Sequence, residues 1–145
     1  MTVFKEAKIK ILSVIENLDS SGLTDGEAEK NEAEYDGYFK YSDGDVVLTY
    51  SESGESGEVN SEVEYTGGVL FVRRRGAIES ELRFEKNVPH SSVYSVPPYK
   101  FDAVVETRKI RAELMENGGK IELYYNMKIG GAEKSARMKI WISTN

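Results

Sequence analysis

The sequence predicts an all-β protein, a single antiparallel up-and-down β-barrel of eight to ten strands. Apolar and polar residues alternate with a period of two along most of the chain. This alternation is typical of strands that present one face to a core and the other to water. Short glycine-containing turns separate the alternating segments. A meander with such short connections removes its unpaired edges by closing into a barrel, whereas a sandwich usually needs longer Greek-key connections.

Length, composition and charge limit the classes of function. The chain has 145 residues, which fits one domain over residues 1–145 with a core of its own. It has no cysteine, which excludes disulfides and thiolate chemistry and favours a cytoplasmic location. Its 25 acidic and 19 basic residues give a net charge of −6, which disfavours nucleic acid and anionic membranes as partners. No apolar stretch approaches the roughly 20 residues of a membrane-spanning helix.

Four strands are predicted in the first half of the chain. Polar segments end them: a flexible hairpin loop at 19–27, the turn "SDGD" at 42–45, and the loop "ESGESGE" at 52–58. The residues expected to face the core are Ala7, Ile9, Ile11 and Ile15, then Ala33, Tyr35, Phe39 and Tyr41, then Val46, Leu48 and Tyr50, then Val59, Val63 and Tyr65.

In the second half, residues 69–75 form a strand that turns at Gly76, and a further strand runs from Ile78 to Phe84. The segment 87–99 contains all three prolines, which exclude a central strand, so we expect an irregular crossing with a short strand near Val93. Along the strand 100–115 the apolar parity switches near residues 108–109, which predicts a β-bulge.

The clearest hairpin lies at the end of the chain. Residues 120–129, "KIELYYNMKI", alternate almost without exception, and Gly130 and Gly131 then reverse the chain. The alternation resumes from Ala132 to Ile142. No segment has the period of an amphipathic helix.

Four segments also resemble a family of uncharacterised bacterial proteins, the YwiB-like proteins. They are "YDGYFKYSDGDVVLTYSES", "VRRRGAIESELRF", "VYSVPPYKFDAVVETRKI" and "GKIELYYNMKIGG". The family's R-x-G pattern corresponds to Arg74, Arg75 and Gly76. Its Y-x-T-P-x-G pattern is matched in part, by Tyr94 and Pro97. The resemblance covers about residues 3–143. It implies a calycin-like (lipocalin-like) barrel in a cytoplasmic bacterial protein, with no assigned activity and no catalytic residues to transfer.

Three consecutive arginines, Arg73, Arg74 and Arg75, are the first candidate for function. Alternate residues of a strand point to opposite faces, so either Arg74 or its two neighbours point inward. The resemblance favours Arg74 as the arginine that points inward. A buried guanidinium must be paired, either with carboxylates or with an anionic ligand. Three hypotheses stay open at this point, a structural ion pair, a ligand anchor and a nucleic-acid contact, and the candidate carboxylates are Glu62, Glu64 and Glu106.

Nine tyrosines are the second candidate, because five of them lie at core positions of the predicted strands. Strand propensity alone explains much of this content. A cavity lined by aromatic faces and hydroxyls is the functional alternative. The predicted ligand-binding residues are therefore Arg74, Tyr50 and Tyr125.

Catalysis and metal binding have little support in the sequence. His90 is the single histidine, and one histidine without cysteine does not make a usual zinc site. Ser91 and Ser92 beside it lack any nucleophile-elbow motif. The loop 19–27 lacks the core pattern of a calcium loop. We therefore predict no catalytic residues, no metal and no cofactor, and a protein that is not an enzyme.

Two functions remain. The preferred hypothesis is a non-catalytic barrel that encloses a small anionic or amphipathic molecule, with neither nucleic acid nor membrane as a partner. The alternative is a filled barrel that acts as a protein-interaction module, either as a monomer or as a homodimer formed through an exposed patch. Trp141, on the outward parity of the last strand, is the candidate residue for that patch.

Overall fold

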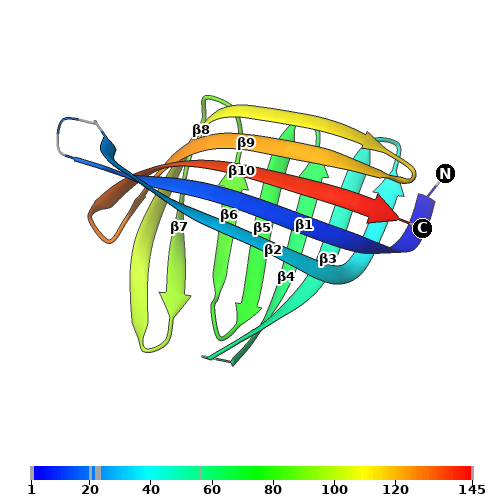
Figure 1. The fold of residues 1–145 in the computed structure, drawn as a ribbon, viewed down its shortest axis with the longest axis horizontal. Helices are drawn as coiled ribbons and strands as arrows, with labels where there is room; N and C mark the ends of the chain where they lie inside the picture. The colour runs from blue at the N-terminus through cyan, green and yellow to red at the C-terminus, as the bar shows by residue number, and fades with distance from the viewer. Residues whose placement is uncertain (1, 20, 22–23, 56, 145) are drawn as a thin grey trace.

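The computed structural model describes residues 2–19, 21, 24–55 and 57–144, and for residues 24–27 it describes the backbone alone. These residues form ten strands and no helix (Figure 1). The strands are β1 (Thr2–Leu18), β2 (Thr24–Ser42), β3 (Asp45–Gly54), β4 (Gly57–Thr66), β5 (Val69–Gly76), β6 (Ser80–Phe84), β7 (Pro89–Val96), β8 (Tyr99–Met115), β9 (Gly118–Ile129) and β10 (Ala132–Thr144).

All ten strands belong to one antiparallel sheet with the order β6-β5-β4-β3-β2-β1-β10-β9-β8-β7. The first and last strands pair with each other along twelve residues, from Ala7 opposite Thr144 to Leu18 opposite Glu133. The two termini therefore lie close together (Figure 1). The predicted wrapping of the chain onto itself is confirmed.

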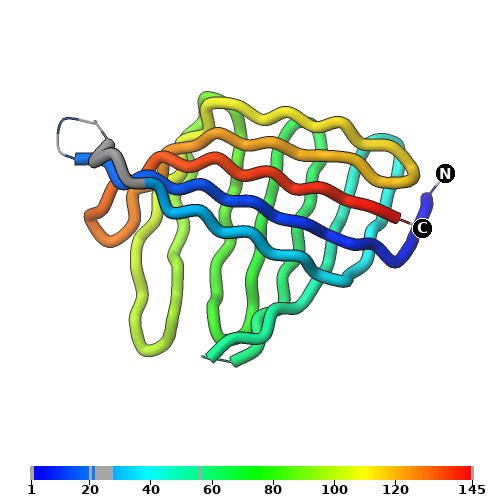
Figure 2. The backbone as a smooth tube through the Cα atoms, in the orientation of Figure 1, coloured from blue at the N-terminus to red at the C-terminus, as the bar shows by residue number. Residues whose placement is uncertain are grey.

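The barrel is nearly closed at the junction between β6 and β7. Glu79 and Ser95 exchange two backbone hydrogen bonds there, with N···O distances of 2.9 and 2.8 Å. The near wall, which includes β1, β2, β9 and β10, crosses the strands of the far wall steeply (Figure 2). Such crossing is expected of a strongly twisted sheet that closes on itself. Within the described residues, no helix has the length and apolar character to cross a membrane.

Most of the predicted elements are present at their predicted places. The 120–142 hairpin forms with Gly130 and Gly131 at its turn, both at positive φ. The predicted bulge is confirmed as a register shift between Thr107 and Lys109 on β8. The shift lets a 17-residue strand follow the curvature of the barrel.

Three connections differ from the prediction. β3 continues to Gly54, so the polar loop predicted at 52–58 is reduced to a tight turn next to Ser56, which lies outside the described residues. β2 already begins at Thr24, which shortens the predicted loop 19–27, and residues 20, 22 and 23 of that loop also lie outside the described residues. The short strand predicted near Val93 is present as β7, but at eight residues it takes up most of the predicted irregular crossing, and it pairs with β8. Pro89 is its first residue, a position where the missing N–H of proline is tolerated.

The core fills one end of the barrel. Its fully buried side chains come from both walls and interdigitate across the interior. They are Phe39, Phe84, Ile9, Leu48, Leu70, Ile121, Leu123, Ile140, Val46, Val63 and Val105. Along β1 burial is complete at Ile9 and only partial from Ile11 to Ile15, where the interior opens into a cavity.

Candidate functional site

A row of polar and aromatic side chains crosses the inner face of the barrel at the edge of the core. Arg74 on β5 lies opposite Ser61 on β4 and opposite Ser80 on β6. Ser61 in turn lies opposite Tyr50 on β3. Arg74 has the same parity as the buried residues Leu70 and Val72, which settles the choice that the sequence alone left open.

Two adjoining cavities meet at this row, and both are partly open to solvent. The first, here called the polar cavity, has a volume of about 280 Å³ and is lined by residues that include Asn31, Tyr35, Tyr50, Glu52 and Arg74. The second, the apolar cavity, has a volume of about 340 Å³ and is lined by residues that include Phe84, Tyr94, Tyr125, Met127, Ile129, Lys134 and Arg74. The three residues predicted from sequence, Arg74, Tyr50 and Tyr125, therefore border these two cavities, and Arg74 lines both. The volumes of the cavities are close to the lower end of the range for small-molecule sites.

The guanidinium of Arg74 lacks a carboxylate partner. Its Nε is buried and makes no hydrogen bond, and no carboxylate in the described part of the chain lies within ion-pair distance. Burial by itself would lower the pKa of Arg74, but Tyr94, Glu52 and Tyr50 more than offset burial, and the pKa is raised. The tyrosines carry charge only at alkaline pH, so at neutral pH the charged neighbour is Glu52.

Two serine hydroxyls flank Arg74 and are also without partners. The Oγ atoms of Ser61 and Ser80 are buried and have no partner at hydrogen-bond geometry in the described residues, although Ser61 lies close enough to Tyr50 to act on its pKa, which it lowers. A buried donor without a partner is costly, and such groups in a folded protein require an explanation. Together with Arg74, the serines form a group of donors that matches the oxygens of a carboxylate or a similar anion.

Aromatic rings line both cavities. Tyr35 and Tyr50 stack in the polar cavity, with ring centroids 4.7 Å apart. Phe84 and Tyr125 make an edge contact in the apolar cavity, with centroids 4.8 Å apart. Burial raises the pKa of Tyr50 and of Tyr125, and Arg74 opposes the increase in both. Burial, followed by the neighbouring carboxylate of Glu52, raises the pKa of Tyr35 to about 12.

The raised pKa of Tyr35 predicts a loss of stability at alkaline pH. An unfolded tyrosine ionises near pH 10, whereas folded Tyr35 holds its proton up to about pH 12. Its contribution to the free energy of unfolding is therefore fully present below pH 10 and is lost as the pH rises to about 12. Replacing Tyr35 with phenylalanine should flatten the decrease over this interval, as measured by urea unfolding at several pH values. A difference absorbance titration, wild type minus Tyr35→Phe, that shows ionisation near pH 10 would contradict the assignment.

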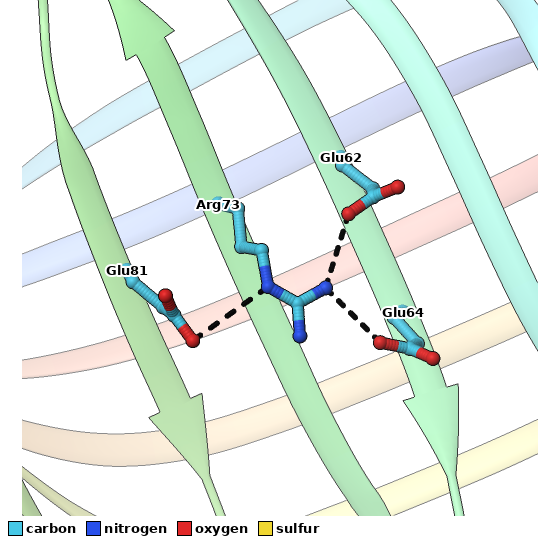
Figure 3. A network of polar contacts seen from close by, with 4 residues as sticks. All are labelled: Glu62, Glu64, Arg73 and Glu81. Atoms are coloured by element: carbon cyan, nitrogen blue, oxygen red, sulfur yellow. Dashed lines mark hydrogen bonds and ion pairs between the residues drawn. The ribbon is translucent and has the colours of Figure 1, made fainter.

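Two of the glutamates that the sequence suggested as partners of Arg74 form ion pairs with Arg73 instead. Arg73 points outward, where its Nη1 lies 3.0 Å from Glu62 and 3.0 Å from Glu64, and its Nε lies 3.6 Å from Glu81 (Figure 3). Glu62 and Glu81 are directly opposite Arg73 in the two flanking ladders, so all three share the outer face. The suggested pairing of Arg74 with Glu62 or Glu64 is therefore wrong, and Glu106 lies exposed on β8.

The remaining candidates from the sequence do not join the cavity. His90 Nε2 lies 3.1 Å from Glu85 Oε1, so the single histidine has a structural partner at the β6–β7 turn. Within the described residues, no group of three or more histidine, aspartate or glutamate side chains is placed to hold a metal ion. Trp141 is half-buried beneath Lys10, whose Nζ lies 5.6 Å from the ring centroid. A homodimer formed through Trp141 stays an untested prediction.

Sequence reasoning missed four residues of this site: Ser80, Glu52 and Tyr94 line the cavities, and Ser61 lies opposite Arg74 in the ladder. Ser61 and Ser80 lie at inward positions between apolar residues, and this break in the apolar pattern was the available signal. Glu52 was assigned to a loop because the end of β3 was placed too early. Tyr94 lies in the proline-containing segment, whose strand register no periodicity revealed.

A protein family, one relative and one solved structure are similar to this chain, and their descriptions state no activity. Residues 17–142 match the family described as "Domain of unknown function (DUF1934)". The "Uncharacterized beta-barrel protein YwiB" of Bacillus subtilis (strain 168) is 26% identical over 126 residues, which cover 87% of this chain and 84% of that protein. The crystal structure of the ywiB protein from Bacillus subtilis matches with a TM-score of 0.85 and 25% identity, covering 98% of this chain and 93% of that chain. The resemblance seen in the sequence is thus confirmed, and the chain belongs to the DUF1934 family.

Proposed function

We propose that the barrel is a non-catalytic binding protein for one small amphipathic anion. Arg74 binds the anionic group, Ser61 and Ser80 add hydrogen bonds, and Tyr50 and Tyr125 contact the organic part of the ligand. The observation that carries the proposal is the buried Nε of Arg74, which has no hydrogen-bond partner and belongs to a residue that lines both cavities.

The two alternatives for Arg74 predict different surroundings. A structural ion pair requires a carboxylate in contact, because a buried charge without one is strongly unfavourable. Arg73 has this arrangement on the outer face, with three glutamates around one guanidinium. Arg74 does not, and two partnerless hydroxyls lie beside it. The geometry at Arg74 therefore favours an anion from solution over a partner from the protein.

The apolar cavity supports an amphipathic ligand over a small inorganic anion. Arg74 lies where the two cavities meet, so an anionic group bound there directs its substituent toward Phe84, Tyr125 and Met127. Burial of an alkyl or aromatic group against these side chains contributes roughly 25 cal/mol for each Å² of apolar surface removed from water. An inorganic anion would gain none of this free energy.

Binding of ten-carbon amphiphiles tests the proposal. We expect calorimetric titration with decanoate and with 2-aminodecanoate to show saturable binding, and 1-decanol, which has no charge, to bind more weakly. Arg74→Met removes the charge and keeps the apolar stem, so it should weaken carboxylate binding about 30-fold or more. Lys134→Met is the matched control, since Lys134 is the other cation that lines the apolar cavity. We expect it to change affinity by less than about threefold.

The stability of the Arg74→Met variant separates the two roles independently of any ligand. Removal of an ion-pair partner from a structural pair is strongly destabilising, whereas removal of a partly buried guanidinium without a carboxylate partner is not. We therefore expect the melting temperature of ligand-free Arg74→Met to equal or exceed that of the wild type. A marked decrease in melting temperature, or carboxylate binding that is unaffected by the substitution, would show that Arg74 is structural.

A further inference from the structure

We propose that the ligand is a zwitterion, with an ammonium group next to its acidic group, and that Glu52 binds the ammonium group. This inference rests on the proposed function of Arg74 and goes beyond it by naming the chemical class of the ligand. The observation behind it is that one interior cavity contains both an acid and a base, which do not contact each other.

Glu52 belongs to the binding space by its position on β3. It has the same parity as Tyr50, two residues earlier on the strand, so its side chain points into the barrel. It is half-buried and lines the polar cavity together with Arg74. The ladder agrees with this placement, because Glu52 lies opposite Val59, whose side chain is buried.

The charge of Glu52 is not neutralised by a contacting partner from the protein. It forms no ion pair with any residue in the described ranges. Its carboxylate accepts a hydrogen bond from Tyr35, and its charge raises the pKa values of Tyr35, Tyr50 and Arg74. Tyr35 is uncharged at neutral pH, and Arg74 lies beyond ion-pair distance. The outer face shows the alternative arrangement, since Lys10 and Glu32 lie 3.0 Å apart there.

A simple anion would neutralise the charge of Arg74, but it would bring a second negative charge close to Glu52. The new negative charge would repel the carboxylate across a partly desolvated cavity, where charges interact more strongly than in bulk water. A ligand with an ammonium group beside its acidic group removes this conflict, because the ammonium group can bind Glu52 while the acidic group binds Arg74. Glu52 would therefore select zwitterions against simple anions, by attraction to one class and repulsion of the other.

The cavities also define where the rest of the ligand lies. The polar cavity contains Glu52, Tyr35 and Tyr50 on one side of Arg74, and the apolar cavity contains Phe84 and Tyr125 on the other. A ligand with both charged groups at one end and an apolar chain at the other matches this division. An α-amino acid with a long alkyl or aromatic side chain has this arrangement.

A pair of probes that differ in one group tests the inference. Decanoate and 2-aminodecanoate share the carboxylate and the chain length, and the second alone has an ammonium group. We expect the wild type to bind 2-aminodecanoate at least tenfold more tightly than decanoate, as measured by calorimetric titration at neutral pH. Glu52→Gln should weaken binding of 2-aminodecanoate and strengthen binding of decanoate, so that the preference disappears.

Two further variants keep the test specific. Glu34→Gln removes one negative charge from the exposed outer face of β2, and it should leave the preference unchanged within about twofold. Glu52→Asp keeps the charge but withdraws it from the cavity, so it should reduce the preference without abolishing it. If Glu52→Gln does not fold, as judged by its melting curve, Glu52→Asp decides the test in its place.

The outcomes separate this inference from the proposed function. If both probes bind with equal affinity to the wild type and to both Glu52 variants, and binding still requires Arg74, the zwitterion inference is wrong and the proposed function stands. If neither probe binds the wild type, the proposed function fails and the inference fails with it. A preference for 2-aminodecanoate that depends on both Glu52 and Arg74 supports both.

Discussion

Replacing Phe84 with alanine is expected to lower the free energy of unfolding by about 3–5 kcal/mol. Phe84 is fully buried, at 0% exposure, where β6 meets the core. It lies opposite the buried Leu70 in the β5–β6 ladder and makes its edge contact with Tyr125. The apolar cavity already lies beside it, so the removed ring enlarges an existing space that the surrounding strands cannot close.

Urea unfolding of the purified variant measures this loss, and Phe4→Ala is the matched control. Phe4 undergoes the same chemical change at a side chain that is 68% exposed and stacks on Tyr38 at the surface. We expect the control to change stability by less than about 1 kcal/mol. Equal effects of the two substitutions would contradict the assignment of Phe84 to a packed, irreplaceable part of the interior.

Replacing Gly37 with alanine is expected to destabilise the barrel by about 1–3 kcal/mol and to disturb the polar cavity. A Cβ atom at this position would clash with the carbonyl oxygen of Thr49 and would lie 3.1 Å from Cβ of Tyr50. Gly37 lies opposite Tyr50 in the β2–β3 ladder, so these atoms belong to the framework of the sheet and cannot rotate away. Any adjustment moves Tyr50, which lines the polar cavity.

Gly54→Ala gives the control for Gly37, because both glycines lie within strands. The nearest atom to a Cβ at Gly54 is 4.0 Å away. This substitution should be neutral or slightly stabilising, since alanine reduces the freedom of the unfolded chain. Thermal unfolding and titration with 2-aminodecanoate would measure both effects. An unchanged melting temperature and affinity for Gly37→Ala would show that the strands separate there more easily than their ladder indicates.

The sequence predicted the strands well wherever alternation was long and uninterrupted. The 120–142 hairpin could be predicted without tertiary information, because the alternation of apolar and polar residues and the two glycines at the turn are local features of the sequence. The bulge near Thr107 was visible for the same reason, as a change of parity within one strand. The strand β7 was not visible in full, because proline and serine residues conceal its alternation and its pairing with β8 depends on residues distant in sequence.

The site was predictable only in part because it depends on register between strands. Parity alone placed Arg74 on one of two faces, and the sequence could not tell which face contained Glu62 and Glu64. The ladder shows these glutamates beside Arg73 on the outer face and leaves Ser61 and Ser80 beside Arg74. The approach of Glu52 to the polar cavity depends on how far β3 extends, which no local pattern defined.

Nuclear magnetic resonance of the arginine Nε–H groups can show whether Arg74 binds an anion inside the barrel. The Nε of Arg74 is buried and without a partner in the free protein. Its resonance, assigned by its absence from Arg74→Met, should shift strongly and saturate on titration with 2-aminodecanoate, while that of the outward Arg73 should not move. Saturable binding that leaves the Arg74 resonance unchanged would place the ligand elsewhere and show that Arg74 does not bind the anionic group.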